Sequence, residues 1–303
     1  MINISLREKG EGQLEGIIVK AISGFFYVKT DGHIYRCKAR GRFKKENLTP
    51  LVGDWVIFYL INGKEGVIEE ILPRQSQLVR PAIVNVQQAV FLFSVKDPPA
   101  NLMLLDRLLV IAESNRLDCV ICFNKIDLVK EEEVIPLTDI YKSIGYQVIL
   151  TSALKGTGID QVRNCLKDKM SVIAGPSGSG KSALLNRVEK GLGLKVGPIS
   201  AKTRRGKQTT RHVELLTLSF GGLVADSPGF SQVDFLDFSK EELPYYFPEI
   251  AREGEKCKFK GCLHEQEPFC NVKEGVNRGE IALSRYQNYL NFLKEIKERE
   301  RRY

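Results

Sequence analysis

The sequence predicts a multidomain protein with an N-terminal β-barrel, a central α/β domain and a mainly helical C-terminal domain. Three observations indicate this order. The chain has 303 residues, more than one hydrophobic core usually organises. Short strand-like runs fill its first part, and further on apolar runs alternate with helical periodicity. We expect the domains to cover residues 1–72, 73–235 and 236–303.

Composition narrows the class of protein. Hydrophobic residues at 43% and charged residues at 27% are typical of a globular protein. The sequence has no apolar run of about eighteen residues and no secretory signal, so we expect a cytoplasmic monomer without a membrane partner. Lys and Arg number 45 against 37 Asp and Glu, a net charge of +8. This charge favours a polyanionic partner, although a merely basic protein would carry it too.

The first 72 residues read as short strands separated by turn signals. Asp31-Gly32 and Asn62-Gly63 lie between strands, as hairpin turns would. Five strands in a segment of this length predict a barrel of the oligonucleotide-binding type, an OB-fold. The expected strands are Gly16–Ala21, Phe25–Thr30, Ile34–Ala39, Asp54–Ile61 and Gly66–Ile71.

The barrel segment mixes aromatic with cationic residues, a combination that suits RNA bases and phosphates. The alternative is that most of these aromatic rings fill a small core, and Trp55 is expected to pack inside. The residues concerned are Phe25, Tyr27, Tyr35, Lys29, Arg36, Lys38, Arg40 and Arg42.

A polar segment at residues 72–77 has the character of a linker, and the pattern then changes to that of a doubly wound parallel sheet. Helical segments are expected near residues 101–115, 158–168, 181–189 and 280–302. The expected strands are Val86–Val95, Asp118–Phe123, Gln147–Leu150, Met170–Ala174 and Gly222–Ala225.

A phosphate-binding loop follows the strand Met170–Ala174. Its G-x-x-x-x-G-K-S pattern opens a helix, so backbone N–H groups and the helix N-terminus would surround phosphate oxygens. Lys181 would neutralise the β- and γ-phosphates, and the Ser182 hydroxyl would bind Mg²⁺. The expected contacts are Gly175, Pro176, Ser177, Gly178, Ser179, Gly180, Lys181, Ser182 and Ala183.

A base-reading motif separates a GTPase from other phosphate-loop enzymes. Asn124-Lys125-Ile126-Asp127 follows the strand Asp118–Phe123. The Asp127 carboxylate can accept two hydrogen bonds from guanine, while Asn124 braces the loop and the Lys125 stem covers the ring. Thr151, Ser152 and Ala153 follow the next strand and are placed to contact the guanine carbonyl.

Two further segments complete the predicted site. Asp226 ends a strand and would hold Mg²⁺, while the Gly229 N–H would reach the γ-phosphate. Thr210 of the pair Thr209-Thr210 would close the Mg²⁺ shell. Phe230, where many GTPases have glutamine, cannot orient the attacking water, so we expect slow intrinsic hydrolysis.

The order of these motifs is permuted. In ordinary GTPases the phosphate loop comes first, but here the segments at 124–127 and 151–153 precede it. The pocket depends on which loops meet in space, so the predicted class is a circularly permuted P-loop GTPase domain.

Four metal-ligating side chains lie close together near the C-terminus. Three thiolates and one imidazole suit a closed, tetrahedral and therefore structural Zn²⁺ site, with one ion per chain, in a region expected to have few apolar residues. The ligands are Cys257, Cys262, His264 and Cys270, and Lys256, Lys258 and Lys260 beside them suit RNA phosphates. Cys119 and Cys122 point to opposite faces of a strand and are expected in the core.

Together these features resemble the RsgA (YjeQ/YloQ) family of ribosome-biogenesis GTPases over nearly the whole chain. The resemblance implies a late assembly factor of the small ribosomal subunit that binds its rRNA and hydrolyses GTP to GDP when that subunit stimulates it. The family typically has histidine where this chain has Gln208, and we expect Gln208 to orient the water as a catalytic residue alongside Lys181 and Thr210. The alternative is a GTP-binding RNA scaffold with negligible hydrolysis; a nucleoside kinase is disfavoured by Asp127.

Overall fold

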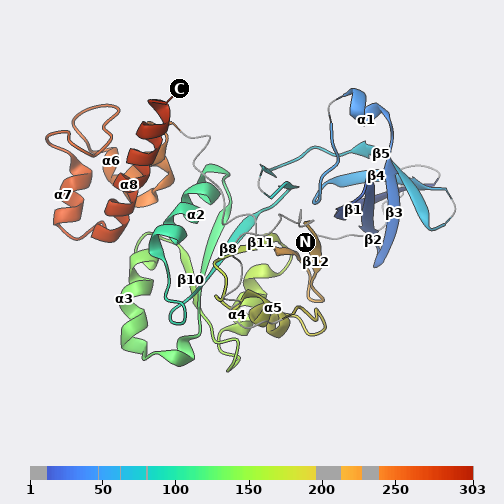
Figure 1. Ribbon diagram of the computed structural model, residues 1–303, viewed down its shortest axis with the longest axis horizontal. Helices are drawn as coiled ribbons and strands as arrows, with labels where there is room; N and C mark the ends of the chain where they lie inside the picture. The colour runs from blue at the N-terminus through green and yellow to red at the C-terminus, as the bar shows by residue number, and fades with distance from the viewer. Residues whose placement is uncertain are drawn as a thin grey trace.

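The structure of the protein is a computed structural model, and it describes residues 12–46, 48–61, 63–79, 81–195, 213–226 and 239–302. Figure 1 shows three units in a row: a barrel, a sheet flanked by helices, and a helical C-terminal unit. Among the helices that are described, none combines the length and apolar character needed to cross a membrane. The predicted fold class is confirmed, whereas the boundaries at residues 72 and 235 stay predictions.

The N-terminal unit is a closed barrel with strand order β1-β2-β3-β5-β4. All neighbouring strands are antiparallel except β3 and β5, which are parallel. Asp31 and Gly32 both have positive φ, 43° and 78°, as a two-residue hairpin turn requires. The strands are β1 (Gln13–Ile22), β2 (Phe25–Thr30), β3 (His33–Ala39), β4 (Trp55–Leu60) and β5 (Glu65–Ile71), with the short helix α1 (Arg42–Lys45) after β3.

The segment after the barrel is more than a linker. Arg74 donates from Nε and Nη2 to the two carboxylate oxygens of Asp54, at 2.7 and 2.8 Å, and Asp54 is fully buried. The strands β6 (Gln77–Leu78) and β7 (Ile83–Val84) then form a small antiparallel pair. The polar composition of residues 72–77 therefore reflects this ion pair, which the sequence pattern does not indicate.

The central unit is a six-stranded sheet with the order β10-β9-β8-β11-β13-β12, parallel except for the edge strand β12. Helices α2 and α3 cover one face and α4 and α5 the other. Cys119 packs on the first face and Cys122 on the second, as predicted. The strands are β8 (Gln88–Ser94), β9 (Asp118–Asn124), β10 (Gln147–Leu150), β11 (Met170–Ala174), β12 (Leu215–Thr217) and β13 (Leu223–Asp226). The helices are α2 (Leu102–Ser114), α3 (Glu131–Lys142), α4 (Ile159–Leu166) and α5 (Lys181–Val188).

The C-terminal unit has a larger apolar core than its composition predicts. Phe247, Tyr289 and Phe292 are fully buried in it, and Val110 of α2 belongs to the same cluster. The expectation of few apolar residues was wrong, because the aromatic side chains of the last helix supply much of this core. The elements are the 3₁₀ helix η3 (Leu243–Tyr246), α6 (Pro248–Gly254), α7 (Asn271–Asn277) and α8 (Leu283–Glu300).

Candidate nucleotide site and metal centre

The predicted nucleotide-binding segments lie at one edge of the central sheet. Asn124 ends β9 and Asp226 ends β13, and Thr151 and Gly175 directly follow β10 and β11. The backbone of Asp226 is in register with Ile173, next to the strand that leads into the phosphate loop. Parallel strands all end on the same side of the sheet, where doubly wound folds bind ligands. The order of the motifs along the chain therefore does not separate them in space.

The phosphate loop depends on close backbone packing and on a cation. A Cβ on Gly175 would lie 2.0 Å from the carbonyl oxygen of Leu92, so only glycine fits against β8. Lys181 Nζ donates to the carbonyl oxygens of Gly175 and Pro176, at 2.8 and 3.0 Å. The loop thus brings an ammonium group and the N-terminus of α5 together, the combination that binds phosphate.

Asn124 joins the three predicted nucleotide segments to one another. Its Nδ2 donates to the carbonyl oxygen of Ser179 in the phosphate loop at 2.9 Å. Its Oδ1 accepts from Thr151 Oγ1 at 3.1 Å and from the Ala153 N–H at 3.2 Å. Asn124 is only 1% exposed, so these bonds are shielded from water. One side chain therefore fixes the base-reading loop and the loop after β10 against the phosphate loop.

The base-reading loop is held in a defined shape. Lys125 has a left-handed backbone, φ 64°, and precedes the 3₁₀ helix η1 (Ile126–Leu128) that carries Asp127. The Ser152 hydroxyl donates to Asp127 Oδ1, and Lys125 Nζ donates to the carbonyl oxygen of Asp97. The Asp127 carboxylate is thereby oriented before any base is bound.

Arg187 of α5 is a supporting residue that sequence reasoning missed. It donates from Nε to the carbonyl oxygen of Ala153 and from Nη2 to that of Leu154, both at 3.0 Å. These bonds tie the helix behind the phosphate loop to the loop after β10. No local pattern marks this role, because the partners lie 34 and 33 residues away.

Several predicted residues fall outside the described part of the chain. These are Gln208, Thr209, Thr210, Gly229 and Phe230, the residues assigned to water positioning, Mg²⁺ closure and the γ-phosphate. The other phosphate-loop positions lie in the loop or on the first turn of α5, at Ser177, Gly178, Ser182 and Ala183. Their contacts to nucleotide stay predictions.

The four predicted metal ligands converge in the C-terminal unit. The Sγ atoms of Cys257, Cys262 and Cys270 and the His264 imidazole offer ligand atoms that all lie within 4.8 Å of one another. Cys257 Sγ and Cys270 Sγ are 3.9 Å apart, and His264 Nδ1 is 3.6 Å and 3.4 Å from them. A tetrahedral ion with thiolates at about 2.3 Å would place its sulfur atoms about 3.8 Å apart. The cluster therefore fits one tetrahedral cation.

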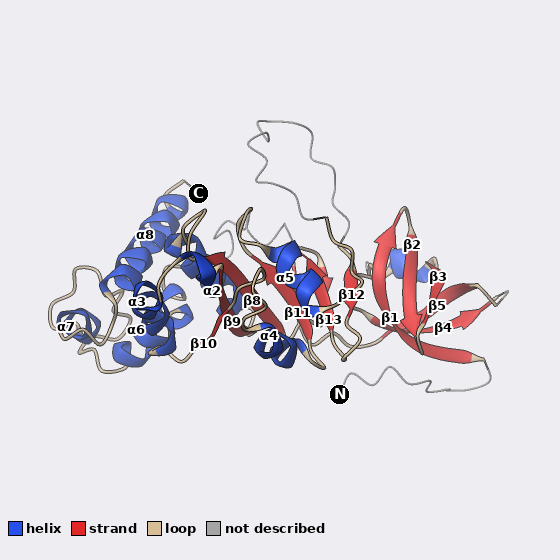
Figure 2. Cartoon of the chain, turned by 90° about the horizontal axis from the view of Figure 1, so that it is seen from below, coloured by secondary structure: helices blue, strands red, loops and turns tan. Residues whose placement is uncertain are grey.

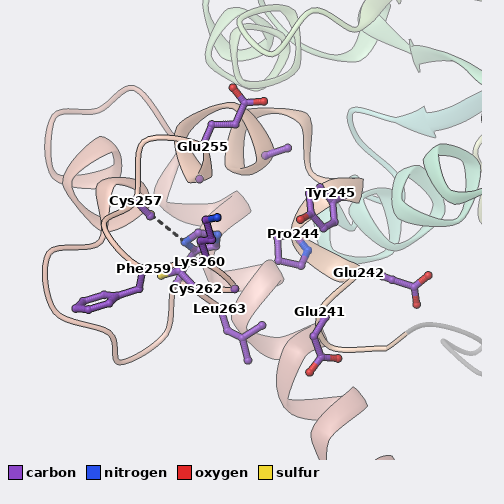
Figure 3. A pocket seen from close by; sticks show the side chains of 14 residues that line it. Glu241, Glu242, Pro244, Tyr245, Glu255, Cys257, Phe259, Lys260, Cys262 and Leu263 are labelled. Carbon is purple, nitrogen blue, oxygen red and sulfur yellow. Dashed lines mark hydrogen bonds between the residues drawn. The ribbon is translucent and has the colours of Figure 1, made fainter.

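The surroundings of the cluster are organised to hold it. The Asn271 N–H donates to Cys257 Sγ at 3.3 Å, and the Tyr286 hydroxyl donates to the His264 carbonyl oxygen at 2.7 Å. Burial raises the pKa of the Cys262 thiol to about 12, so a bound cation is needed to favour its thiolate form. Cys257 and Cys262 line a cavity of about 540 Å³, and Figure 3 shows them among its lining residues.

Aromatic and cationic side chains adjoin on two surfaces. On the barrel, the cationic groups of Arg36 and Lys38 lie 4.7 and 5.2 Å from the centre of the Phe25 ring. Beside the metal cluster, Lys258 lies 5.0 Å from the ring of Phe269, which is 75% exposed. Tyr35, in contrast, packs on the buried Phe58 ring and contributes to the core.

Known proteins match this chain over nearly its whole length. Residues 71–236 match the family described as RsgA GTPase, and residues 15–68 match the RsgA N-terminal domain. A "Small ribosomal subunit biogenesis GTPase RsgA" of Caldanaerobacter subterraneus subsp. tengcongensis is 48% identical over 96% of this chain and 98% of the relative. That of Geobacillus kaustophilus is 50% identical over 95% and 99%.

Two solved structures share the architecture. YjeQ from Thermotoga maritima superposes with a TM-score of 0.83 at 38% identity, covering 94% of this chain and 98% of that one. YloQ, described as a circularly permuted GTPase, superposes with a TM-score of 0.80 at 40% identity, covering 97% and 98%. The permuted arrangement that the motif order predicts is therefore confirmed.

Proposed function

This chain belongs to the RsgA GTPase family, and we propose that it hydrolyses GTP during maturation of the small ribosomal subunit, bound to the RNA of that subunit. The observation that carries the nucleotide assignment is the set of three hydrogen bonds made by the Asn124 side chain, one donated and two accepted, which joins the base-reading segments to the phosphate loop. The ribosomal assignment is supported by the printed function of relatives that match over nearly their full length. A ribosomal partner would place the chain in the cytoplasm.

Different residues would bind the base, the phosphates and the attacking water. Asp127, oriented by Ser152, accepts two hydrogen bonds from guanine, and Lys181 turns from the loop carbonyls to the phosphates. Ser182, Thr210 and Asp226 would hold Mg²⁺, which would neutralise charge at the phosphates. Gln208 orients the attacking water, because an amide can both donate and accept.

The barrel and the metal-binding unit are the proposed RNA contacts. The Phe25 ring with Arg36 and Lys38 on one surface, and Phe269 with Lys258 on the other, combine stacking area with positive charge. The second candidate, an RNA-binding scaffold that holds GTP with negligible hydrolysis, is favoured by Phe230 in place of a water-orienting glutamine.

One assay tests the function. Phosphate release from GTP is expected to be slow for the protein alone and to rise at least about tenfold when purified small ribosomal subunits are added, as catalysis completed by a partner does. Release from ATP stays flat, because adenine presents the wrong hydrogen-bonding edge to Asp127. If the rate of phosphate release from GTP does not rise at any concentration of subunits, the scaffold hypothesis is favoured.

A specificity variant provides the control for the same assay. In Asp127→Asn the side-chain amide can donate a hydrogen bond where the carboxylate only accepted. It therefore no longer pairs with both guanine donors, and it can donate to the carbonyl group that xanthine has in place of the guanine amine. We expect GTP turnover to fall and XTP turnover to rise in the presence of subunits. An Asp127→Asn protein that still prefers GTP would contradict the assigned role.

The metal is proposed to be Zn²⁺ with a structural role. Three thiolates and an imidazole form a set that Zn²⁺ prefers, and all four positions of a tetrahedron are filled by protein. The wild-type protein is therefore expected to contain zinc, and Cys262→Ser is expected to lose it and to unfold its C-terminal helices at a lower temperature. Elemental analysis and thermal circular dichroism measure both.

Cys165→Ser serves as the matched control, because Cys165 lies in α4, outside the cluster. It is expected to keep its zinc content. Equal metal content in Cys262→Ser and Cys165→Ser would exclude the proposed site.

A further inference from the structure

The barrel is attached to the central sheet through the strand β12. β4 pairs with Gln13–Ile17 of β1, so the second half of β1 is not covered by β4 on that edge. Glu214, the residue before β12, forms an antiparallel bridge there with Lys20 of β1. Figures 1 and 2 both show β12 lying between the barrel and the rest of the central sheet.

Two side-chain contacts hold β12 at both of its ends. Lys20 Nζ is 2.8 Å from Glu214 Oε2, and Lys29 Nζ of β2 donates to Thr217 Oγ1 at 2.7 Å. Partial burial lowers the pKa of Lys29. The strand β1 also has a bulge between Ile18 and Lys20, which redirects its edge. The barrel therefore contacts the central sheet at both ends of the strand β12.

That strand lies between the two segments that carry the residues assigned to hydrolysis. Thr210 precedes Glu214 by four residues in the sequence. On the other side, β12 pairs with β13 from Leu215 to Thr217, and β13 ends at Asp226 beside β11 and the phosphate loop. A shift of β12 would therefore reach Asp226 through the pairing of β12 with β13.

We propose that Lys20 and Glu214 are positioning residues that couple RNA contact on the barrel to GTP hydrolysis. The inference rests on the proposed function, since it explains how a bound subunit would stimulate turnover. The Lys20 and Glu214 side chains are 32% and 48% exposed, and such surface pairs contribute little to folding stability. Lys29 reaches the same strand from β2, whose other neighbour is β3 with Arg36 and Lys38. A contact made on β3 can therefore be passed to β12 through β2, which lies beside β3 and contacts β12 through Lys29.

Charge reversal tests the coupling. Lys20→Glu and Glu214→Lys each place like charges together, and we expect either one to lower subunit-stimulated kcat about fivefold, the size of a surface ion-pair effect. The KM for GTP and the affinity for subunits should stay within about twofold of wild type, because neither residue belongs to the predicted nucleotide-binding segments and the Lys20 ammonium is already paired with Glu214. The double variant Lys20→Glu/Glu214→Lys restores the opposite charges and should recover stimulated kcat.

Lys142→Glu is the matched control, because it makes the same charge change at the exposed end of α3. If subunits stimulate Lys20→Glu and Glu214→Lys as strongly as they stimulate wild type and Lys142→Glu, the coupling is refuted while the proposed function stands. A double variant as slow as the single ones also refutes it. Wild-type protein that subunits do not stimulate overturns the proposed function and, with it, the coupling.

Discussion

Gly180→Ala is expected to weaken GTP binding by about a hundredfold, corresponding to about 3 kcal/mol. A Cβ at this position would lie 2.4 Å from Asn124 Nδ2, and the backbone φ of +95° disfavours any L side chain. A side-chain tip can often move aside, but Asn124 is buried and holds three hydrogen bonds. Relief of the clash must therefore break the contacts that join the base-reading loop to the phosphate loop.

Gly191→Ala isolates the backbone contribution. Gly191 has a similar φ of +104°, and a Cβ there would meet nothing within 4 Å. This variant should lose about 1 kcal/mol of folding stability and keep wild-type affinity for GTP. Titration of both variants with a fluorescent GTP analogue provides the comparison. If Gly180→Ala binds as tightly as Gly191→Ala, the junction at Asn124 does not govern the nucleotide site.

Local signals explain how much of the fold and the site could be predicted. The strand β2 at Phe25–Thr30 and the strands at Gln147–Leu150 and Met170–Ala174 have the bounds that their apolar runs predict. The loop at residues 175–180 joins β11 to α5, as predicted, because its glycine spacing and the apolar run before it are local signals. Each of these features depends on neighbours within a few residues, which a single sequence records.

Features that depend on distant partners could not be predicted. The helix α3 was missed because Pro136 lies inside it, and proline ordinarily interrupts a helical pattern. The pairing of Lys20 with Glu214 leaves no trace in either local sequence, and the same holds for Arg74 with Asp54. Such pairs are set by how the domains pack.

Arg285→Met is expected to cost about 3–5 kcal/mol of folding stability, the effect of removing one partner of a buried ion network. Arg285 of α8 donates from Nε and Nη2 to Glu249 of α6, at 2.7 and 3.1 Å, and from Nη1 to Asp106 of α2 at 2.7 Å. Arg285 and Asp106 are 1% exposed and Glu249 is 5% exposed. Without the guanidinium, two carboxylates would remain buried with no cation between them.

The network also positions the C-terminal unit. It joins α8 and α6 of the C-terminal unit to α2 of the central unit. Asp106 additionally accepts from the Tyr141 hydroxyl at 3.0 Å and from Asn288 Nδ2 at 2.6 Å. Losing Arg285 is therefore expected to loosen the contact between the helical unit and the central domain, which hydrogen exchange of α8 would detect.

The deficit of Arg285→Met should depend on pH. Burial raises the pKa of Asp106 even with Arg285 in place, so the folded state binds this proton more tightly than the unfolded state does. A carboxyl that is protonated in both the folded and the unfolded state does not lower the free energy of unfolding. It lowers that free energy increasingly as the pH rises above its pKa in the unfolded chain. Urea unfolding is therefore expected to give a larger loss at pH 8 than at pH 5.

Arg278→Met is the matched control for this prediction. Arg278 pairs with Glu280 at 2.6 Å and with Glu253 at 3.8 Å, but its side chain is 46% exposed. Exposed pairs contribute at most about 1 kcal/mol, so this variant should unfold close to wild type at both pH values. Adding Asp106→Asn to Arg285→Met removes one stranded charge and should recover part of the loss. Equal stability of the two arginine variants, or a loss independent of pH, would show that the buried charges do not hold the domains together.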